Sequence, residues 1–249
     1  MIKFIHLKKE QQQVVPLFEG AFIENKPIPF PENGITTAYS NIFYWAHLLA
    51  FETSEFPLHP HEGFEIMTFV FKGSLEHYDT ATKTWSAMDA GGVQVIEAAS
   101  GIEHSERITK GTQLFQIWFD PDFSKTLKNN PTYKGYQANE FEKRQNNGIT
   151  SLSYVKPDGP IASKTNGLEI EKLSFSSGEY PTMLDKDYTY SYYLLDGDMK
   201  INNEIVVKDD FLVFKDIDHI NFIVNEKAEL FVIKTPSKVD YKRFLNRYR

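Results

Sequence analysis

The chain has 249 residues and a formal net charge of −7. A polyanion partner needs a basic face to displace counterions, so this charge argues against direct nucleic-acid binding. The absence of cysteine excludes disulfides and thiolate metal ligands. The first residues lack the apolar run of a signal peptide, and no stretch has the length of a membrane helix. We therefore expect a cytoplasmic protein without a membrane partner.

Short runs rich in Val, Ile, Phe and Tyr, separated by turn residues, predict an all-β fold. Residues 66–80 indicate two strands joined at Lys72 and Gly73, and single strands follow within residues 91–98 and 113–119. A second series opens at residues 167–180. The polar segment between the two series contains many turn formers, so we expect a connection there.

The two series resemble each other. Residues 56–77, FPLHPHEGFEIMTFVFKGSLEH, align without a gap on residues 180–201, YPTMLDKDYTYSYYLLDGDMKI. The apolar strand and the glycine turn repeat, but the histidines do not: His59, His61 and His77 fall on Met183, Asp185 and Ile201. This pattern predicts a duplicated barrel whose first copy alone keeps ligand-type residues. Coincidence between two strand-turn-strand segments is the alternative.

Two histidine motifs are typical of a metal site. His59 and His61 lie two residues apart, and successive side chains of a strand alternate, so both project on the same side. Pro60 between them lacks a ladder donor, which suits a strand start or an edge strand. His104 and Glu106 have the same spacing after a turn. Three imidazoles and one carboxylate suit one divalent ion, Fe, Mn, Ni, Cu or Zn, with up to two positions left open.

Each residue also has a structural interpretation, because hydrogen-bonded histidines are common on protein surfaces. His77 is a candidate neighbour of the ligands or an ordinary strand histidine. Glu65 shares the parity of the ligands and is a candidate further contact. Met67 and Phe69 are expected in the core. If either lies near the metal, it is expected to line a pocket there. The remaining histidines have no partner at ligand spacing and are expected to be structural or solvent-facing: His6, His47 and His219.

The chain resembles the pirin family of the cupin superfamily in three segments: HPHEGFEIMTFVFKGSLEHYDT, AASGIEHSE and LFQIWF. The family motifs run HPHxGFE and GIxHSE, and the match is strongest over residues 56–119. The resemblance implies a bicupin, which has two tandem cupin-type β-barrels (double-stranded β-helices), the second without metal. It also implies that the metal is typically iron and that its ligands are His59, His61, His104 and Glu106.

These observations predict four segments: a metal-binding barrel over residues 1–120, a connection over 121–148, a metal-free barrel over 149–235 and a tail over 236–249. In the tail, apolar residues follow helical spacing at Tyr241, Phe244, Leu245 and Tyr248. This spacing predicts a short amphipathic C-terminal helix. A helix this short needs packing in water, so we expect it to dock on the protein itself, with membrane attachment as the alternative.

Two functions fit these predictions. The first is an Fe(II)-type dioxygenase acting on flavonol-like (quercetin-type) or other enediol or phenolic substrates, as the resemblance to bacterial pirins implies. Glu106 would then be both ligand and catalytic base. The second is a non-enzymatic, metal- or redox-responsive regulator that binds a protein partner, as the resemblance to eukaryotic pirins implies. The sequence near the motifs offers no basic or apolar docking stretch, which favours the enzyme.

Two further expectations concern the pocket and the assembly. Glu62 stands where pirin-like chains usually carry a basic residue, so the mouth of the pocket is expected to be more acidic than in relatives. We expect the chain to be a monomer.

Overall fold

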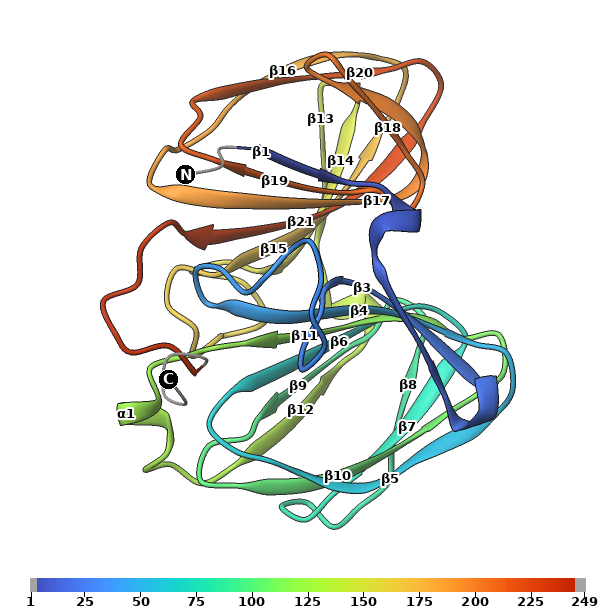
Figure 1. The fold of residues 1–249 in the computed structure, drawn as a ribbon, viewed down its shortest axis with the longest axis vertical. Coiled ribbons are helices and arrows are strands. Elements are labelled where there is room, and N and C mark those ends of the chain that lie inside the picture. The colour runs from blue at the N-terminus through green and yellow to red at the C-terminus, as the bar shows by residue number, and fades with distance from the viewer. Residues whose placement is uncertain (1–3, 245–249) are drawn as a thin grey trace. The chain divides into compact units, whose positions relative to one another are not determined.

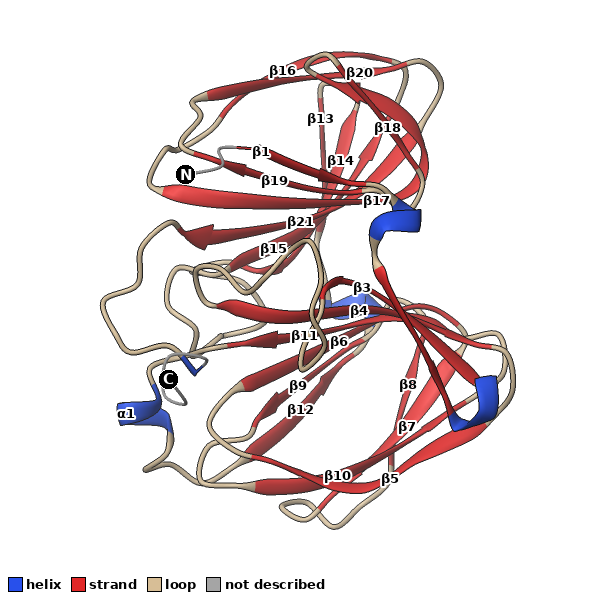
Figure 2. Ribbon diagram, in the orientation of Figure 1, coloured by secondary structure: helices blue, strands red, loops and turns tan. Residues whose placement is uncertain are grey.

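A computed structural model describes residues 4–244 and divides the chain into two compact units. The N-terminal unit comprises Gln12–Glu140 and the segment from Asp240, and the C-terminal unit comprises Met1–Gln11 and Phe141–Val239. Strands dominate both units, and the helices are short turns between them (Figure 2). The expected all-β, two-barrel class is confirmed. No helix among the described residues is long and apolar enough to cross a membrane.

Two antiparallel sheets build the N-terminal unit (Figure 1). Its strands are β2 (Gln13–Leu17), β3 (Phe22–Ile28), β4 (Ile42–Ala50), β5 (Ser54–His61), β6 (Glu65–Lys72), β7 (Ser74–Asp79), β8 (Ser86–Asp89), β9 (Val93–Glu97), β10 (Ile102–Ile108), β11 (Gln113–Phe119) and β12 (Thr132–Tyr136). Short helical turns are η2 (Phe18–Gly20), α1 (Phe123–Thr126) and η3 (Ala138–Glu140). The larger sheet has the order β12-β9-β6-β11-β4-β3-β2, and the smaller has the order β5-β10-β7-β8.

Apolar side chains from both sheets fill the interior of this unit in two buried clusters, one around Phe43 and Ile66, the other around Phe22 and Leu114. Burying a side chain of this size stabilises the fold by about 1.5–3 kcal/mol relative to leaving it exposed. Gly73 makes the turn between β6 and β7 with φ +75°, and a Cβ there would lie 2.4 Å from a Thr112 side-chain atom. The break between the two strands expected within residues 66–80 is therefore confirmed at this glycine.

The C-terminal unit is also a set of antiparallel strands around one apolar cluster that includes Tyr192, Leu212 and Phe222. Its elements are β1 (Phe4–Leu7), η1 (Lys9–Gln11), β13 (Lys143–Asn146), β14 (Ile149–Val155), β15 (Glu169–Phe175), β16 (Gly178–Met183), β17 (Tyr188–Ile201), β18 (Glu204–Val207), β19 (Phe211–Lys215), β20 (His219–Val224) and β21 (Ala228–Pro236). The main path of the sheet is β1-β19-β17-β21-β15-β14-β13, and the long strand β17 also pairs with β18 and β20.

Strand pairing in the two units agrees with the duplication seen in the sequence. In the N-terminal unit β5 pairs with β10, which places His59 opposite His104. In the C-terminal unit β16 pairs with β20, which places Met183 opposite His219. The gapless overlay aligns Met183 with His59, so the two aligned residues hold the same position in equivalent strand pairs.

The bounds of the units differ from the expected segments. β1 belongs to the C-terminal unit, where it pairs with β19 and stacks Phe4 on Phe214 at 4.8 Å between ring centroids. Within the expected connection 121–148, β12 pairs with β9 and completes the larger N-terminal sheet, whereas β13 pairs with β14. An edge strand has unpaired backbone groups, and short segments distant in sequence can pair with it. Apolar spacing does not predict such pairing.

The described part of the tail, residues 237–244, contains no α-helix, which corrects the expected C-terminal helix over those residues. Leu245 and Tyr248, which the helix prediction included, lie outside the described residues. The Tyr241 hydroxyl donates to the Asp120 carbonyl at 2.5 Å, and the Phe244 N–H donates to the Asp120 carboxylate. The Phe244 ring stacks on Phe43 at 5.0 Å. These tertiary contacts take the place of helical hydrogen bonds, and they confirm that this part of the tail docks on the protein.

We predict that Phe244→Ala lowers the free energy of unfolding of the N-terminal unit by about 2 kcal/mol, because the half-buried ring leaves a cavity among aromatic neighbours. All three tryptophans lie in this unit, so their fluorescence during urea titration reports its unfolding selectively. Lys238→Ala, at an exposed position in the same tail, is the control and should change the midpoint little. Equal midpoints for the two variants would contradict the docking role of Phe244.

Candidate metal centre

Three histidines converge inside the N-terminal unit. His59 and His61 lie on β5, and His104 lies opposite His59 on β10. One ring nitrogen from each lies within 4.8 Å of the others, and the ring centroids are 4.3–4.9 Å apart. β5 is the edge of the smaller sheet, as Pro60 suggested. The predicted convergence of these three residues is present in the structure.

Hydrogen bonding leaves one nitrogen of each imidazole available to a cation. The Nδ1–H of His59 donates to the Pro57 carbonyl at 2.7 Å, which leaves Nε2 as the nitrogen with a lone pair. His61 Nε2 and both nitrogens of His104 are buried without a hydrogen-bond partner among residues 4–244. Unpartnered buried polar atoms are costly, and a bound ion would satisfy them. The donor set therefore fits a divalent metal.

Burial also keeps these imidazoles in the form that a metal requires. Desolvation, followed by repulsion from His59, lowers the pKa of His61 to about 3. Desolvation and the neighbouring histidines hold the pKa of His104 well below its usual range. Both rings are consequently neutral at pH 7, with lone pairs free to coordinate.

Glu106 lies on β10 two residues after His104, but it falls in a second group. Its carboxylate, His104 and His77 have ligand atoms within 4.8 Å of one another, and this group shares only His104 with the first. A β-bulge interrupts the β5–β10 register between His104 and Glu106. A bulge redirects neighbouring side chains, so the simple two-residue spacing does not place all four candidates around one point.

Two glutamine side chains hold the Glu106 carboxylate. Gln94 of β9 donates to Oε1, and Gln116 of β11 donates to Oε2 at 3.0 Å. The Trp118 indole N–H donates to Gln116 Oε1 at 3.1 Å, which turns the amide nitrogen of Gln116 toward Glu106. Burial raises the pKa of Glu106 to about 7, and the two amide donors oppose that rise. Sequence analysis missed both glutamines, although a glutamine within an apolar strand was an available signal.

His77 lies on β7 opposite Glu106, next to the centre. Its Nε2 is 2.9 Å from Asp79 Oδ2, and its ring stacks on Tyr133 at 4.0 Å between centroids. Desolvation lowers the pKa of His77 to about 4, against the opposing effect of Asp79. The structure thus places His77 beside the candidate ligands, in an orientation fixed by Asp79 and Tyr133.

Met67 and Phe69 are buried, as expected for core residues, but neither they nor Glu65 face the centre. Thr68 of β6 accepts a hydrogen bond from Gln94 at 3.1 Å, so the face of β6 that carries Thr68 is the face toward the centre. Met67 and Phe69 are its neighbours and project to the opposite face, as does Glu65. Glu65 does not share the direction of the ligands because β5 and β6 belong to different sheets. The chain changes sheet at Gly63, where φ is +91° and a Cβ would lie 2.2 Å from the Phe123 ring.

An open pocket of about 400 Å³ adjoins His61. Glu62 and Glu103 both line it, together with Pro60 and Thr80. The pocket therefore carries the negative charge that the sequence predicted for Glu62, and Glu103 adds to it.

Comparison with known proteins agrees with this geometry. A family model described as Pirin matches residues 38–119, a range that contains both histidine motifs. Residues 38–119 form a pirin domain. The resemblance inferred from the motifs is confirmed, and the three histidines and Glu106 all belong to this domain.

Relatives of this chain include a pirin-like protein and a quercetin 2,3-dioxygenase. A pirin-like protein of Caulobacter vibrioides is 29% identical over 184 residues, covering 72% of this chain and 76% of that protein. A quercetin 2,3-dioxygenase of Escherichia coli K12 is 39% identical over 70 residues, covering 27% of this chain and 30% of that protein. The crystal structure of the Escherichia coli pirin YhhW in complex with nickel(II) matches with a TM-score of 0.78 at 19% identity, covering 94% of this chain and 100% of that chain. That likeness shows the shared fold.

We predict that His61→Ala removes most bound metal, because losing one of three imidazoles takes away a ligand that the remaining two cannot replace. Elemental analysis of protein made without an affinity tag measures this loss. His219→Ala, in the C-terminal unit, is the matched histidine control and should retain the wild-type metal content. Full metal content in His61→Ala would contradict the assignment.

A second prediction concerns the glutamines. Gln116→Met removes the donor to Glu106 with little change in side-chain volume, and it should weaken metal affinity about 10–100-fold if Glu106 is a ligand. Competition with a coloured chelator gives the affinity. Gln113→Met on the same strand is the control and should bind as the wild type does. If the metal affinity of Gln116→Met equals that of the wild type, Glu106 and its amide donors do not contribute to metal binding.

Proposed function

We propose that the pirin domain is a metal-dependent dioxygenase for flavonol-like (quercetin-type) or other enediol or phenolic substrates. The observation that carries this proposal is the group of three converging histidines, of which His104 is buried and the other two are partly buried, beside the carboxylate of Glu106. Relatives named quercetin 2,3-dioxygenase support the reaction class. We also propose that the protein is soluble and cytoplasmic, as expected from the sequence.

His59, His61 and His104 would hold the ion, and Glu106 is the candidate fourth ligand. A bound divalent metal would supply the Lewis acidity and redox chemistry that reaction with dioxygen requires. We expect Fe(II), with Mn, Ni, Cu and Zn as the alternatives. The protein supplies the positions of these side chains and a buried setting around them.

Glu106 would accept the proton of the substrate hydroxyl at a carboxylate oxygen. The two amide donors fix the plane of the carboxylate and keep it from rotating away from His104. Because Glu106 is only 2% exposed, bulk water does not compete for the proton at that oxygen. A positioned carboxylate of this kind is a suitable general base.

Aromatic side chains packed beside the histidines would hold His61 in position. Trp118 stacks on Tyr44 at 4.2 Å and on Phe64 at 5.1 Å, and its ring meets the edge of His61 at 5.2 Å. None of these three rings lines the pocket beside His61, so they would support the position of the His61 ring. Neither Tyr44 nor Phe64 was singled out by the sequence analysis.

We predict that Glu106→Gln lowers turnover of a flavonol substrate by about a hundredfold while most metal remains, because the amide keeps an oxygen ligand but loses basicity. Oxygen uptake, normalised to the metal content of each preparation, measures the effect. Glu76→Gln, on the neighbouring strand β7 and exposed, is the control. A metal-loaded Glu106→Gln enzyme with wild-type turnover would show that Glu106 is not the base.

The proposed activity itself is tested by oxygen uptake across a panel of flavonols and catechols with Fe(II)-loaded wild-type protein. Uptake with a flavonol or catechol supports the dioxygenase. Absence of uptake across the whole panel, with metal content verified, would favour the metal-responsive regulator that binds a protein partner.

A further inference from the structure

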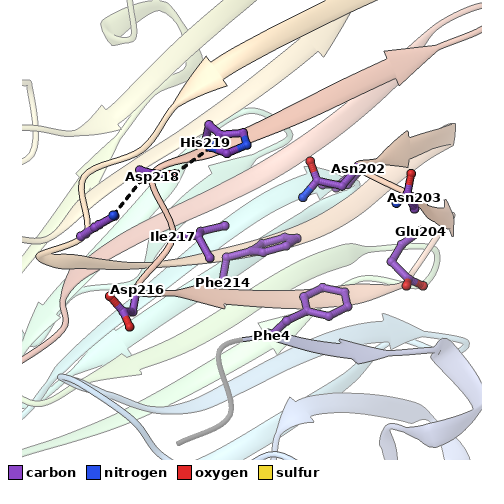
Figure 3. A pocket seen from close by; sticks show the side chains of 11 residues that line it. Phe4, Asn202, Asn203, Glu204, Phe214, Asp216, Ile217, Asp218 and His219 are labelled. Carbon is purple, nitrogen blue, oxygen red and sulfur yellow. Dashed lines mark hydrogen bonds and ion pairs between the residues drawn. The ribbon is translucent and has the colours of Figure 1, made fainter.

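The C-terminal unit contains a pocket of about 480 Å³ that the proposed dioxygenase chemistry does not use. Its apolar floor includes Phe4 and Phe214, whose rings stack, with Ile201 and Ile217 beside them. Figure 3 shows the two rings between the turn that carries Asn203 and Glu204 and the segment from Asp216 to His219. The volume lies in the range typical of small-molecule sites.

One residue that lines the pocket corresponds in strand register, but not in the direction of its side chain, to a candidate ligand of the N-terminal unit. His219, which lines it, holds the place in the β16–β20 pair that His104 holds in the β5–β10 pair. Met183, opposite His219, is 80% exposed and supplies no imidazole. The His219 side chain is also 76% exposed, whereas His104 is buried, so the equivalent pair in the C-terminal unit presents no inward histidine set. The ligand of this pocket must therefore be recognised by other groups.

Charges around the rim are mainly negative. Asp218 pairs with the Lys186 ammonium at 2.8 Å and with His219 Nδ1 at 2.7 Å, so it neutralises the lysine that lines the pocket. Glu204 and Asp216 add two further carboxylates to the lining. Glu204 lies 3.5 Å from His6 Nδ1, a group that carries charge only when protonated. The lining therefore carries three carboxylates and one ammonium over a floor of aromatic rings.

We propose that this pocket binds a small organic cation with an aromatic or apolar body, of the arylalkylamine class. The faces of Phe4 and Phe214 attract a cation through their quadrupoles and also bury an apolar body. The Glu204 and Asp216 carboxylates supply the counter-charge for an ammonium group. The same carboxylates would repel an anionic ligand of the same shape. This site is independent of the metal and of the proposed dioxygenase.

Titration calorimetry with the full chain after metal removal by a chelator tests the proposal. The probes are 2-phenylethylamine, neutral 2-phenylethanol and anionic 3-phenylpropionate. The amine should bind at least about tenfold more tightly than the carboxylate, with the alcohol between them, and added salt should weaken the binding of the amine. Equal affinities, or no detectable binding of the amine, would overturn the proposal.

Variants locate the site. The double variant E204Q/D216N should weaken amine binding about five- to tenfold and reduce the preference over 3-phenylpropionate, whereas Glu226→Gln, an exposed carboxylate between β20 and β21, should bind as the wild type does. Methyl NMR should show the amine shifting the signals of Ile201 and Ile217 but not those of Ile66 in the N-terminal unit. Backbone spectra of the double variant verify its fold. Shifts confined to N-terminal methyl groups, or wild-type binding by the double variant, would place the amine elsewhere and contradict the proposal.

Discussion

The antiparallel pairing of β5 with β10 is the interaction on which the metal centre depends. It sets His59 directly opposite His104 and leaves His61 on the same side of its strand. A shift of this register by one residue would turn the ligands of one strand to the outer face. The packed core on both sides opposes such a shift, because it would expose apolar residues such as Ile102 at the same time.

The two sheets of the N-terminal unit contribute different chemistry to the centre. The smaller sheet carries the candidate ligands on β5 and β10 and His77 on β7, whereas the larger sheet supplies Gln94 and Gln116 from β9 and β11. Hydrogen bonds from these glutamines to Glu106 therefore join the sheets across the interior. The C-terminal unit keeps an equivalent strand pair without the histidine group, and a separate pocket with acidic side chains and an aromatic floor adjoins His219.

Much of this arrangement could be predicted from sequence, because the alternating direction of side chains along a single strand is a local property. His59 and His61 share a strand, so their common direction followed from spacing alone. The same reasoning failed for Glu65, since the chain passes to another sheet at Gly63 and the alternation of side chains restarts there. Long-range features also escaped prediction. The pairing of β1 with β19 and the contact of Phe244 with Phe43 depend on which edge or cavity is left open by the rest of the fold.

A single metal ion is expected to bind in the N-terminal unit through His59, His61 and His104. Anomalous diffraction at the absorption edge of the metal, from crystals of tag-free protein, tests it most directly. We expect one strong peak at about 2.0–2.2 Å from one ring nitrogen of each histidine. The same map shows whether Glu106 turns from its glutamine partners to become the fourth ligand. Absence of a peak at the histidines in metal-replete crystals, or a peak in the C-terminal pocket instead, would contradict the account.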